Sequence, residues 1–258
     1  MKDCQPDGLK RHFEELGLKR GDNVLVHSRL FSFGRIVGSS PCQTLYDSLI
    51  DYLGPDSTIA VPTHLLGESE PYDPQKTPSH ESGVFSEYVR QLPNAFRSLC
   101  PIHNHASVGP NARCLEDSDP TISFGQGSDF STFYNNKFTL VLLGCGFTHG
   151  GTYLHHLEAL MDAPYRHWIE LHRLLVPRGK VEPSPIVVRY FARKDQAYHE
   201  DFDKIIPVLR KSGALREAEL SYGKSFAIPL DELHKTTVEM VALDPYFLVK
   251  KVVDESVV

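Results

Sequence analysis

The side chains most suggestive of chemistry lie where a glycine-rich turn leads into a helix. Residues 144–151 read GCGFTHGG and follow the most apolar segment, and a helical pattern then carries His155 and Glu158. Because these two residues are three positions apart, they share one helix face. The positive helix end favours a neutral imidazole, which suits a general base. A capped helix whose histidine packs on a neighbour explains the pattern equally well.

A second candidate is the loop that leaves the first apolar strand, residues 28–40. It carries Gly34 and Gly38, which let the backbone approach a ligand, and Arg29 and Arg35, which can pair with phosphate. The start of the following helix adds N–H groups that attract anions. Because the loop matches neither a dinucleotide fingerprint nor a P-loop, an ordinary connection is the alternative.

A long proline-rich loop, residues 62–79, follows the next strand and leads to a helix that carries Glu87. Loops of this length are costly to order and often bind ligands. Val84, Tyr88 and Gln91 are the helical neighbours of Glu87, so a solvated surface carboxylate is the simpler explanation for that residue.

The 13 histidines raise the question of a metal site. His103 and His105 would point the same way on a strand, whereas His155 and His156 diverge by about 100° on a helix. His149 lies nearby, but no HExxH or similar spacing ties these clusters together. We therefore expect no metal, with a metal hydrolase as a minor alternative.

The elements that position these residues alternate between strands and helices. Apolar strands are expected at 23–27, 57–61 and 138–143, and helices at 6–16, 43–53, 84–92 and 151–161. Continuous apolar strands joined by helices indicate a parallel sheet covered on both faces. After residue 165 the pattern changes to paired strands at 169–176 and 186–191, with helices near 201–212 and 230–242. The sequence predicts a three-layer α/β/α fold with a mostly parallel central sheet and an antiparallel extension in the C-terminal third.

Composition narrows the class of protein. The chain has 258 residues, 41% of them hydrophobic, and a net charge of −6, which argues against nucleic acid and anionic membrane partners. No apolar run approaches the roughly 20 residues of a membrane helix, and the first residues lack a signal-peptide core. The five cysteines are scattered without a CxxC pair. We expect a soluble, cytoplasmic protein whose cysteines are mostly small buried side chains.

Several blocks together resemble a known family. VLVHSRLFSFGRIVGS, LGPDSTIAVPTH, YDPQKTPS, GVFSEYVRQLPNAFRS and GGTYLHHLE occur in order over about residues 15–160, and DPYFL ends the pattern at 244–248. These blocks are similar to those of the aminoglycoside 3-N-acetyltransferases, also called antibiotic N-acetyltransferases, which do not have the GNAT fold. The resemblance implies acyl transfer from acetyl-coenzyme A (acetyl-CoA), or a short acyl-CoA, to a primary amine.

The resemblance also implies roles for individual residues. His155 falls in the segment T-x-L-H-x-x-E and Glu87 in G-x-x-x-E-x-x-R, the segments implicated in catalysis. The coenzyme A loop corresponds to Ser28, Arg29, Leu30, Ser32, Phe33, Gly34 and Val37, and Arg97 and Ser98 correspond to a further wall of that cleft. Acceptor contacts are expected from His64, Asp73 and Glu158.

The implied reaction is direct transfer without an acyl-enzyme. An amine at neutral pH is mostly ammonium, so His155, oriented by Glu87, would remove a proton and later deliver it to the thiolate. Where many members read R-S-x-H-P-x-H-S, this chain has Cys100 and Asn104 in place of the first histidine and the last serine. The assignment of His155 rather than His156 rests on this alignment.

The acceptor stays open between two classes. Glu68, Glu70, Asp73 and Glu81 would suit a polycationic aminoglycoside, whereas Arg166, His167 and Arg173 would suit an amino sugar linked to a nucleotide. We favour a biosynthetic amino sugar, with aminoglycoside resistance as the alternative and a non-catalytic coenzyme A-binding protein as a third reading. We expect one domain over 1–258, with a catalytic core at 1–164 and an acceptor-shaping extension at 165–258, and homo-oligomer formation is open.

Overall fold

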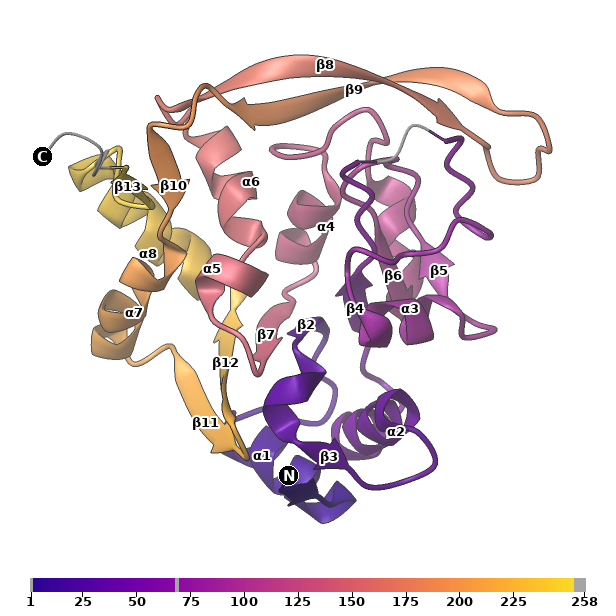
Figure 1. Cartoon of the computed structure of the whole chain (residues 1–258), viewed down its shortest axis with the longest axis vertical. Helices are drawn as coiled ribbons and strands as arrows, with labels where there is room; N and C mark the ends of the chain where they lie inside the picture. Colours follow the sequence, from indigo (N-terminus) through magenta and orange to yellow (C-terminus); the bar gives the residue numbers. More distant parts are fainter. Residues whose placement is uncertain (1, 68–69, 253–258) are drawn as a thin grey trace, which may run out of the picture.

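A seven-stranded sheet lies at the centre of the molecule, between two layers of helices (Figure 1). The computed structural model describes residues 2–67 and 70–252, so Glu68 of the proline-rich loop lies outside the described residues. In order across the sheet, the strands are β11 (Arg216–Leu220), β12 (Gly223–Pro229), β7 (Thr139–Leu143), β2 (Val24–Ser28), β4 (Ile59–Pro62), β6 (His105–Val108) and β5 (Phe96–Arg97).

The parallel part of the sheet is its centre. Strand β2 pairs in parallel with β4 and with β7, whereas β12, β11, β6 and β5 join through antiparallel pairings. Five of the seven strands consequently run in one direction. The predicted three-layer α/β fold with a mostly parallel sheet is confirmed, and the four antiparallel outer strands are additions that the sequence patterns did not reveal.

The central strands bury both faces, which explains their continuous apolar sequences. Leu25 and Leu140 face a core made with α4 (Asp129–Asn135), α5 (Phe147–Gly150), α6 (Tyr153–Leu160), α7 (Ile206–Ser212) and α8 (Leu230–Leu243). Val24 and Val141 face the opposite core, made with α1 (Pro6–Glu15), α2 (Pro41–Leu53) and α3 (Val84–Arg90). Among the described residues, no helix is long and apolar enough to span a bilayer.

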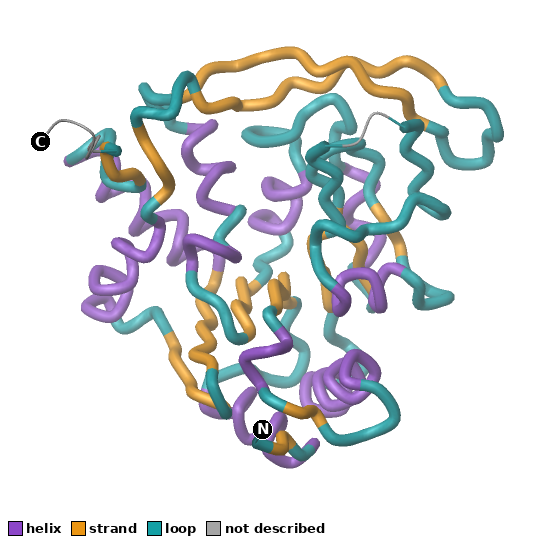
Figure 2. The backbone as a smooth tube through the Cα atoms, in the orientation of Figure 1, coloured by secondary structure: helices purple, strands orange, loops and turns teal. Residues whose placement is uncertain are grey.

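A two-stranded ribbon, β8 (Arg166–Leu175) and β9 (Ser184–Arg193), lies outside the sheet and crosses one end of the molecule (Figure 2). This is the predicted antiparallel pair. Isolated bridges join it to Tyr72 and Ile122. The remaining elements are the pairs β1 (Asp3–Cys4) with β3 (Arg35–Ile36) and β10 (Tyr198–Glu200) with β13 (Val249–Lys251), and the 3-10 helices η1 (Leu30–Phe33), η2 (Ala112–Asp117) and η3 (Phe202–Ile205).

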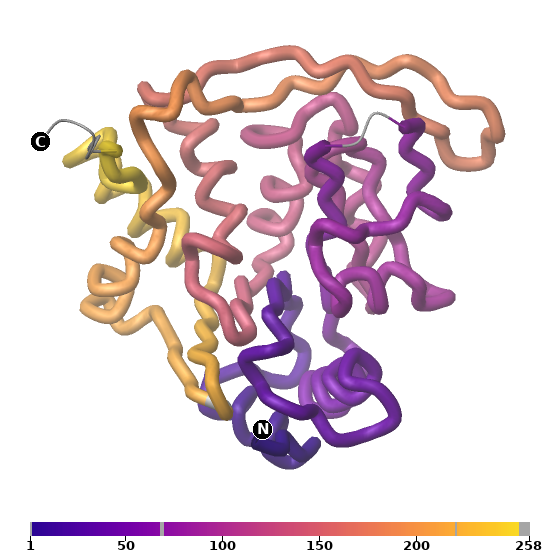
Figure 3. Tube along the Cα trace, viewed as in Figure 1, coloured from indigo at the N-terminus to yellow at the C-terminus, as the bar shows by residue number. Residues whose placement is uncertain are grey.

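Parallel pairing brings the carboxyl ends of β2, β4 and β7 to one edge, so distant segments of the chain meet there (Figure 3). The loops after β2 and β7 touch where the Ser32 hydroxyl donates to the Gly144 carbonyl, 2.8 Å away. Gly144 has a φ of +73°, and a Cβ on it would lie 2.6 Å from the Ser32 Cβ. Only glycine permits this approach.

Candidate active site

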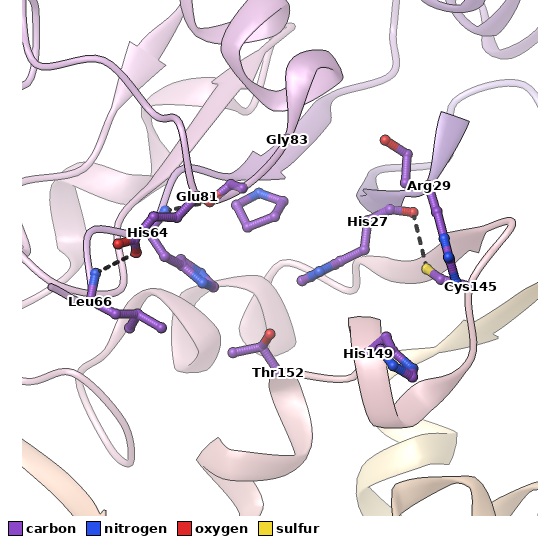
Figure 4. A pocket seen from close by; sticks show the side chains of 12 residues that line it. His27, Arg29, His64, Leu66, Glu81, Gly83, Cys145, His149 and Thr152 are labelled. Atoms are coloured by element: carbon purple, nitrogen blue, oxygen red, sulfur yellow. Dashed lines mark hydrogen bonds between the residues drawn. The ribbon is translucent and has the colours of Figure 1, made fainter. Parts of the chain in front are cut away.

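A cavity of about 320 Å³ opens at this edge of the sheet (Figure 4). Ligands of open α/β sheets bind outside the carboxyl ends of the strands, and this cavity has that location. The predicted residues Ser28, Arg29 and His64 line it. The other lining residues are His27, Pro62, Leu66, Glu81, Ser82, Gly83, Cys145, His149 and Thr152.

Two further cavities, of about 430 and 360 Å³, continue this space along α3 and the loop after β2. Gly83 lines both the first and second cavities, and Val84 lines both the second and third. The third is strongly apolar, and its wall includes Phe31, whose residue surface is 91% exposed, and Val84, 67% exposed. Such exposed apolar side chains beside a groove are typical of a ligand surface.

Some residues of the predicted coenzyme A loop line this surface, and others are buried in the core. Leu30 and Gly34 line the third cavity. Phe33 is instead buried and packs edge-on against His12, and the backbone N–H of Val37 donates to the Cys4 carbonyl at 2.9 Å. Phe33 and Val37 thus hold the loop in place.

The imidazole of His155 contacts a carboxylate on its own helix. Nδ1 of His155 lies 2.6 Å from Oε2 of Glu158, which is fully buried. Nη2 of Arg166, which can only donate, also lies 3.0 Å from Nδ1. Because the carboxylate only accepts and lies closer, we assign the proton to Nδ1 and the lone pair to Nε2. The His155 side chain is 22% exposed and thus accessible. One turn earlier on the same face, Thr152 lines the first cavity.

The Glu158 carboxylate is held from several sides. The Tyr165 hydroxyl donates to Oε1 at 2.8 Å, and the Arg166 guanidinium approaches Oε2 to 2.7 Å. Arg166 also pairs with Glu200 at 2.8 Å. These contacts stabilise the Glu158 anion and restrict its rotation, which in turn orients His155. Glu158 lies behind His155 and is not exposed to an acceptor, in contrast to its expected contact role.

Glu87 occupies a different corner of the molecule. Its carboxylate accepts from Arg90 at 2.6 Å, from Gln91 at 2.7 Å and from the backbone N–H of Ser79 at 2.7 Å. Burial raises the pKa of Glu87, but these donors outweigh it and lower the pKa to about 2. Glu87 lines the second cavity, and its described contacts do not include His155. The expected contact between them is replaced by Glu158.

Three other predicted residues have structural contacts. The Arg97 guanidinium is buried and donates to Thr63 and Asn104. Ser98 is buried and donates to Asp129. Asp73 accepts from the backbone N–H of Gln75 at 2.9 Å within a turn, and none of the three lines the first cavity.

Buried histidines form a second polar group beside the cavity. Nε2 of His64 lies 3.4 Å from Nε2 of His105, whose Nδ1 lies 2.9 Å from the buried Asp129 carboxylate. Burial, followed by the charges of neighbouring histidines, lowers the pKa of His64 and of His103 well below the usual value. Burial also lowers the pKa of His27 to about 3. The imidazoles of His27, His64 and His103 are therefore neutral at neutral pH.

The cysteine thiols near the cavity are poor candidates for nucleophiles. Burial raises the pKa of the Cys145 thiol in the cavity wall to about 11 and that of Cys100 to about 12, so both are protonated and poor nucleophiles. Among residues 2–67 and 70–252, no group of three or more His, Cys, Asp or Glu side chains could hold a metal ion.

The sequence analysis did not identify four residues of this region, His27, Thr152, Tyr165 and Asp129. It also did not identify the contact between His105 and Asp129. Thr152 could have been found, because it precedes His155 by one helical turn. His105 and Asp129 are 24 residues apart and meet only through tertiary packing.

The comparisons with known proteins agree on one family. A model of the aminoglycoside 3-N-acetyltransferase family matches residues 25–242. Aminoglycoside N(3)-acetyltransferase VIII of Streptomyces fradiae is 28% identical over 220 residues, which span 77% of this chain and 74% of that protein. Aminoglycoside N(3)-acetyltransferase IX of Micromonospora chalcea is 26% identical over 193 residues, 67% of this chain and 68% of that protein.

Solved structures show the same fold. Aminoglycoside acetyltransferase AAC(3)-IVa, in complex with a gentamicin, aligns with a TM-score of 0.81 and 24% identity over 96% of this chain and 92% of that chain. AAC-IIIb with coenzyme A aligns with a TM-score of 0.79 and 20% identity over 94% of this chain and 97% of that chain.

Fold and cavity thus define an α/β protein with a ligand-sized cavity at the carboxyl ends of its parallel strands. The chain belongs to the aminoglycoside 3-N-acetyltransferase family, because the family model covers most of its length. The prediction of an N-acetyltransferase that uses acetyl-CoA is thereby confirmed.

Proposed function

We propose that this protein transfers the acetyl group of acetyl-CoA to a primary amine of an aminoglycoside, with His155 as the general base. The observation that carries this proposal is the 2.6 Å contact of His155 with the buried Glu158, one helical turn from the cavity residue Thr152. The free Nε2 can take a proton from the attacking amine and pass it to the departing thiolate. A positioned base of this kind contributes about 10²–10⁴-fold.

The donor would occupy the three cavities, which share the lining residues Gly83 and Val84. Ser28 and Arg29 line the first cavity, and the Phe31 and Val84 side chains would offer apolar surface to the pantetheine arm. Reaction with a thioester needs no enzyme nucleophile, in keeping with the raised pKa of Cys145. The need for acetyl-CoA also supports the cytoplasm as the location that we propose.

Charge favours an aminoglycoside over a sugar linked to a nucleotide. The Glu81 carboxylate lines the first cavity and can attract a cationic acceptor. Arg166, which we expected to serve a phosphate, is instead committed to Glu158 and Glu200. The curated relatives are named for aminoglycosides, and one solved structure is described with a gentamicin. The biosynthetic amino sugar is therefore the second candidate.

We further propose that the whole chain acts as one domain, with the catalytic core at 1–164 and the remainder shaping the acceptor side. Residues after 165 complete the central sheet through β11 and β12 and supply Arg166 to the His155 network. Both observations support a single functional unit. Deletion of 165–258 should then abolish folding, which circular dichroism of the truncated chain would measure.

Calorimetry with acetyl-CoA, followed by thiol release against a panel of amines, tests the proposed activity. The panel should hold aminoglycosides and nucleotide-linked amino sugars. Release with aminoglycosides alone would support the proposal, and release with nucleotide-linked sugars alone would transfer it to the second candidate. Acetyl-CoA binding without release for any amine would contradict catalysis.

A further inference from the structure

His155 lies one helical turn from a residue of the first cavity, whereas another imidazole with an organised set of partners, that of His64, lines the cavity itself. His64 and His27 point toward one another across the space, and the buried Nε2 of His27 has no partner among the described residues (Figure 4). His64 follows β4 by two residues, and its backbone N–H is fixed by the Ser82 hydroxyl at 2.8 Å. The His64 ring is therefore held at the cavity wall.

The Asp129 carboxylate determines where the ring protons of His105 and His64 lie. The Asp129 carboxylate already accepts from the Ser98 hydroxyl, and it faces Nδ1 of His105 at 2.9 Å. Because a carboxylate oxygen accepts, this contact places a proton on Nδ1 of His105, and in that neutral tautomer Nε2 has the lone pair. The facing Nε2 of His64 must then carry a proton, which leaves a lone pair on Nδ1 of His64.

One oxygen of the Asp129 carboxylate can accept a further hydrogen bond or a proton. Its other oxygen, Oδ1, is buried and lacks a hydrogen-bond partner among the described residues. Phe130 and Phe133 pack edge-on against the His105 ring at 4.9 Å and exclude water from this path. A buried carboxylate with one oxygen unpaired in apolar surroundings is costly.

The reaction itself calls for two proton acceptors. An ammonium acceptor R–NH₃⁺ must lose one proton to become nucleophilic, and its nitrogen loses another as the amide forms. With acetyl-CoA, the products are the amide, the thiol and one free proton. His155 can carry only the proton that goes to the thiolate, so the first proton needs another route.

We propose that His64 accepts the first proton of the substrate ammonium, with His105 and Asp129 as positioning residues that relay it. The N–H bond of the ammonium breaks as Nδ1–H forms on His64. The Nε2 proton of His64 moves to Nε2 of His105, and the Nδ1 proton of His105 moves to Asp129. An ammonium and a carboxylate thus become an amine and a carboxylic acid, and the reverse shift later releases the proton to water.

This inference rests on the proposed function, and it explains why a weakly basic imidazole can serve. Burial lowers the pKa of His64, so an isolated imidazolium would be unfavourable there. In the relay no imidazole keeps a charge. The titratable groups facing His64 are His27, His103, His105 and His155. Arg29, Glu81 and His149 are the other charged or titratable groups of the cavity apart from Cys145.

The experiment compares the pH dependence of kcat/KM for the acceptor in the unmodified protein and in Asp129→Asn, His105→Gln and His64→Gln. We expect losses of about 10²-fold below neutral pH, where the acceptor enters as ammonium. The losses should shrink about tenfold per pH unit as the amine deprotonates in solution, because the free amine needs no relay. An equal loss at every pH in all three variants would overturn the proposal, since it would indicate a structural role only.

His12→Asn is the matched control, because His12 is also buried and hydrogen-bonded, to Ser225 at 2.8 Å, but lies outside the cavity. Its pH profile should run parallel to that of the unmodified protein. Nitrogen-15 NMR of the unmodified protein tests the relay without turnover. A proton on Nε2 of His64 supports it, and a proton on Nδ1 overturns it. Absence of any acetyl transfer with the expected tautomer would contradict the proposed function instead.

Discussion

Two helices beside the cavities each pair a carboxylate with a basic residue three positions away. On α3 the partner of Glu87 is Arg90, and on α6 the partner of Glu158 is His155. A guanidinium never gives up its proton, so the α3 pair is a fixed ion pair. An imidazole does exchange protons near neutral pH. The same spacing therefore gives a structural contact in one helix and a device for proton transfer in the other.

Burial sharpens this difference. The Glu158 side chain is fully buried, with Tyr165 and Arg166 as further partners, whereas the Glu87 side chain is 20% exposed beside the second cavity. A buried carboxylate cannot rotate into solvent, so it keeps one direction and fixes the orientation of the side chain that it contacts. Site function thus depends more on the partner and the surroundings than on the presence of a carboxylate in a motif.

Replacement of His155 should have the largest effect. His155→Gln removes the base but keeps a polar side chain, and we expect kcat to fall by about 10²–10⁴-fold. Affinity for acetyl-CoA should stay close to that of the unmodified protein, because His155 lines none of the three cavities proposed for the donor. Single-turnover thiol release and calorimetry measure the two quantities. Weakened donor binding with intact kcat would contradict the assignment.

Glu158→Gln should have the next largest effect. The amide can present a donor to His155 and stabilise the wrong tautomer, so we expect kcat to fall by at least about 10²-fold. Arg166 also loses a buried partner, which should destabilise the fold by about 3 kcal/mol. Steady-state kinetics and urea unfolding of the variant measure both. A rate close to that of the unmodified protein would show that His155 needs no orientation.

Tyr165→Phe should weaken the same network without breaking it. The variant loses one hydrogen bond to Glu158, a loss of about 1.5–3 kcal/mol. Part of this loss lowers the free energy of unfolding, and part raises the reaction barrier because His155 is less well oriented. We expect kcat to fall by roughly tenfold, which corresponds to about 1.4 kcal/mol in the barrier. The matched comparison is Tyr153→Phe, whose hydroxyl contacts His234 instead. Equal losses of kcat in both variants would argue against a specific effect.

Glu87→Gln should have the smallest effect and should appear in stability. The pKa of Glu87 is lowered from 4.5 to about 2, so its ion pair stabilises the fold above pH 4.5 and this contribution is lost as pH falls toward 2. With its partial exposure, we expect a contribution of about 1–2 kcal/mol at pH 7. Urea unfolding from pH 7 to 2 should show a flatter curve for the variant. A loss of kcat as large as that of Glu158→Gln would remove the distinction between the two helices.

The sequence predicted the central fold because local patterns encode it. The strands around Leu25 and Leu140 are continuous apolar runs, and helix α2 is bounded by Pro41 and Gly54. The outer strands had no such signal. Strand β11 reads REAEL and β6 reads HASV, and each becomes a strand through pairing with a partner that the local sequence does not specify.

The site was predictable where its residues are close in sequence. His155 and Glu158 share a helix face, which their spacing already indicated. The family resemblance drew attention to Glu87, but its local ion pair with Arg90 depends on which way α3 faces. The contact of His105 with Asp129 joins a strand to a helix across the core, so no spacing rule could have revealed it.

The β8–β9 ribbon has a consequence for how this enzyme family can diversify. Its two strands pair with each other over ten residue positions, and the central sheet takes no hydrogen-bonded strand from it. Changes at the exposed positions of this ribbon would therefore leave the hydrogen bonds of the sheet intact, provided that Arg166 and the buried Val188 and Phe191, which belong to the hydrophobic core, are retained. If the ribbon shapes the acceptor side, as we propose, new substrate ranges can arise by sequence change at these exposed positions while the donor side is inherited unchanged.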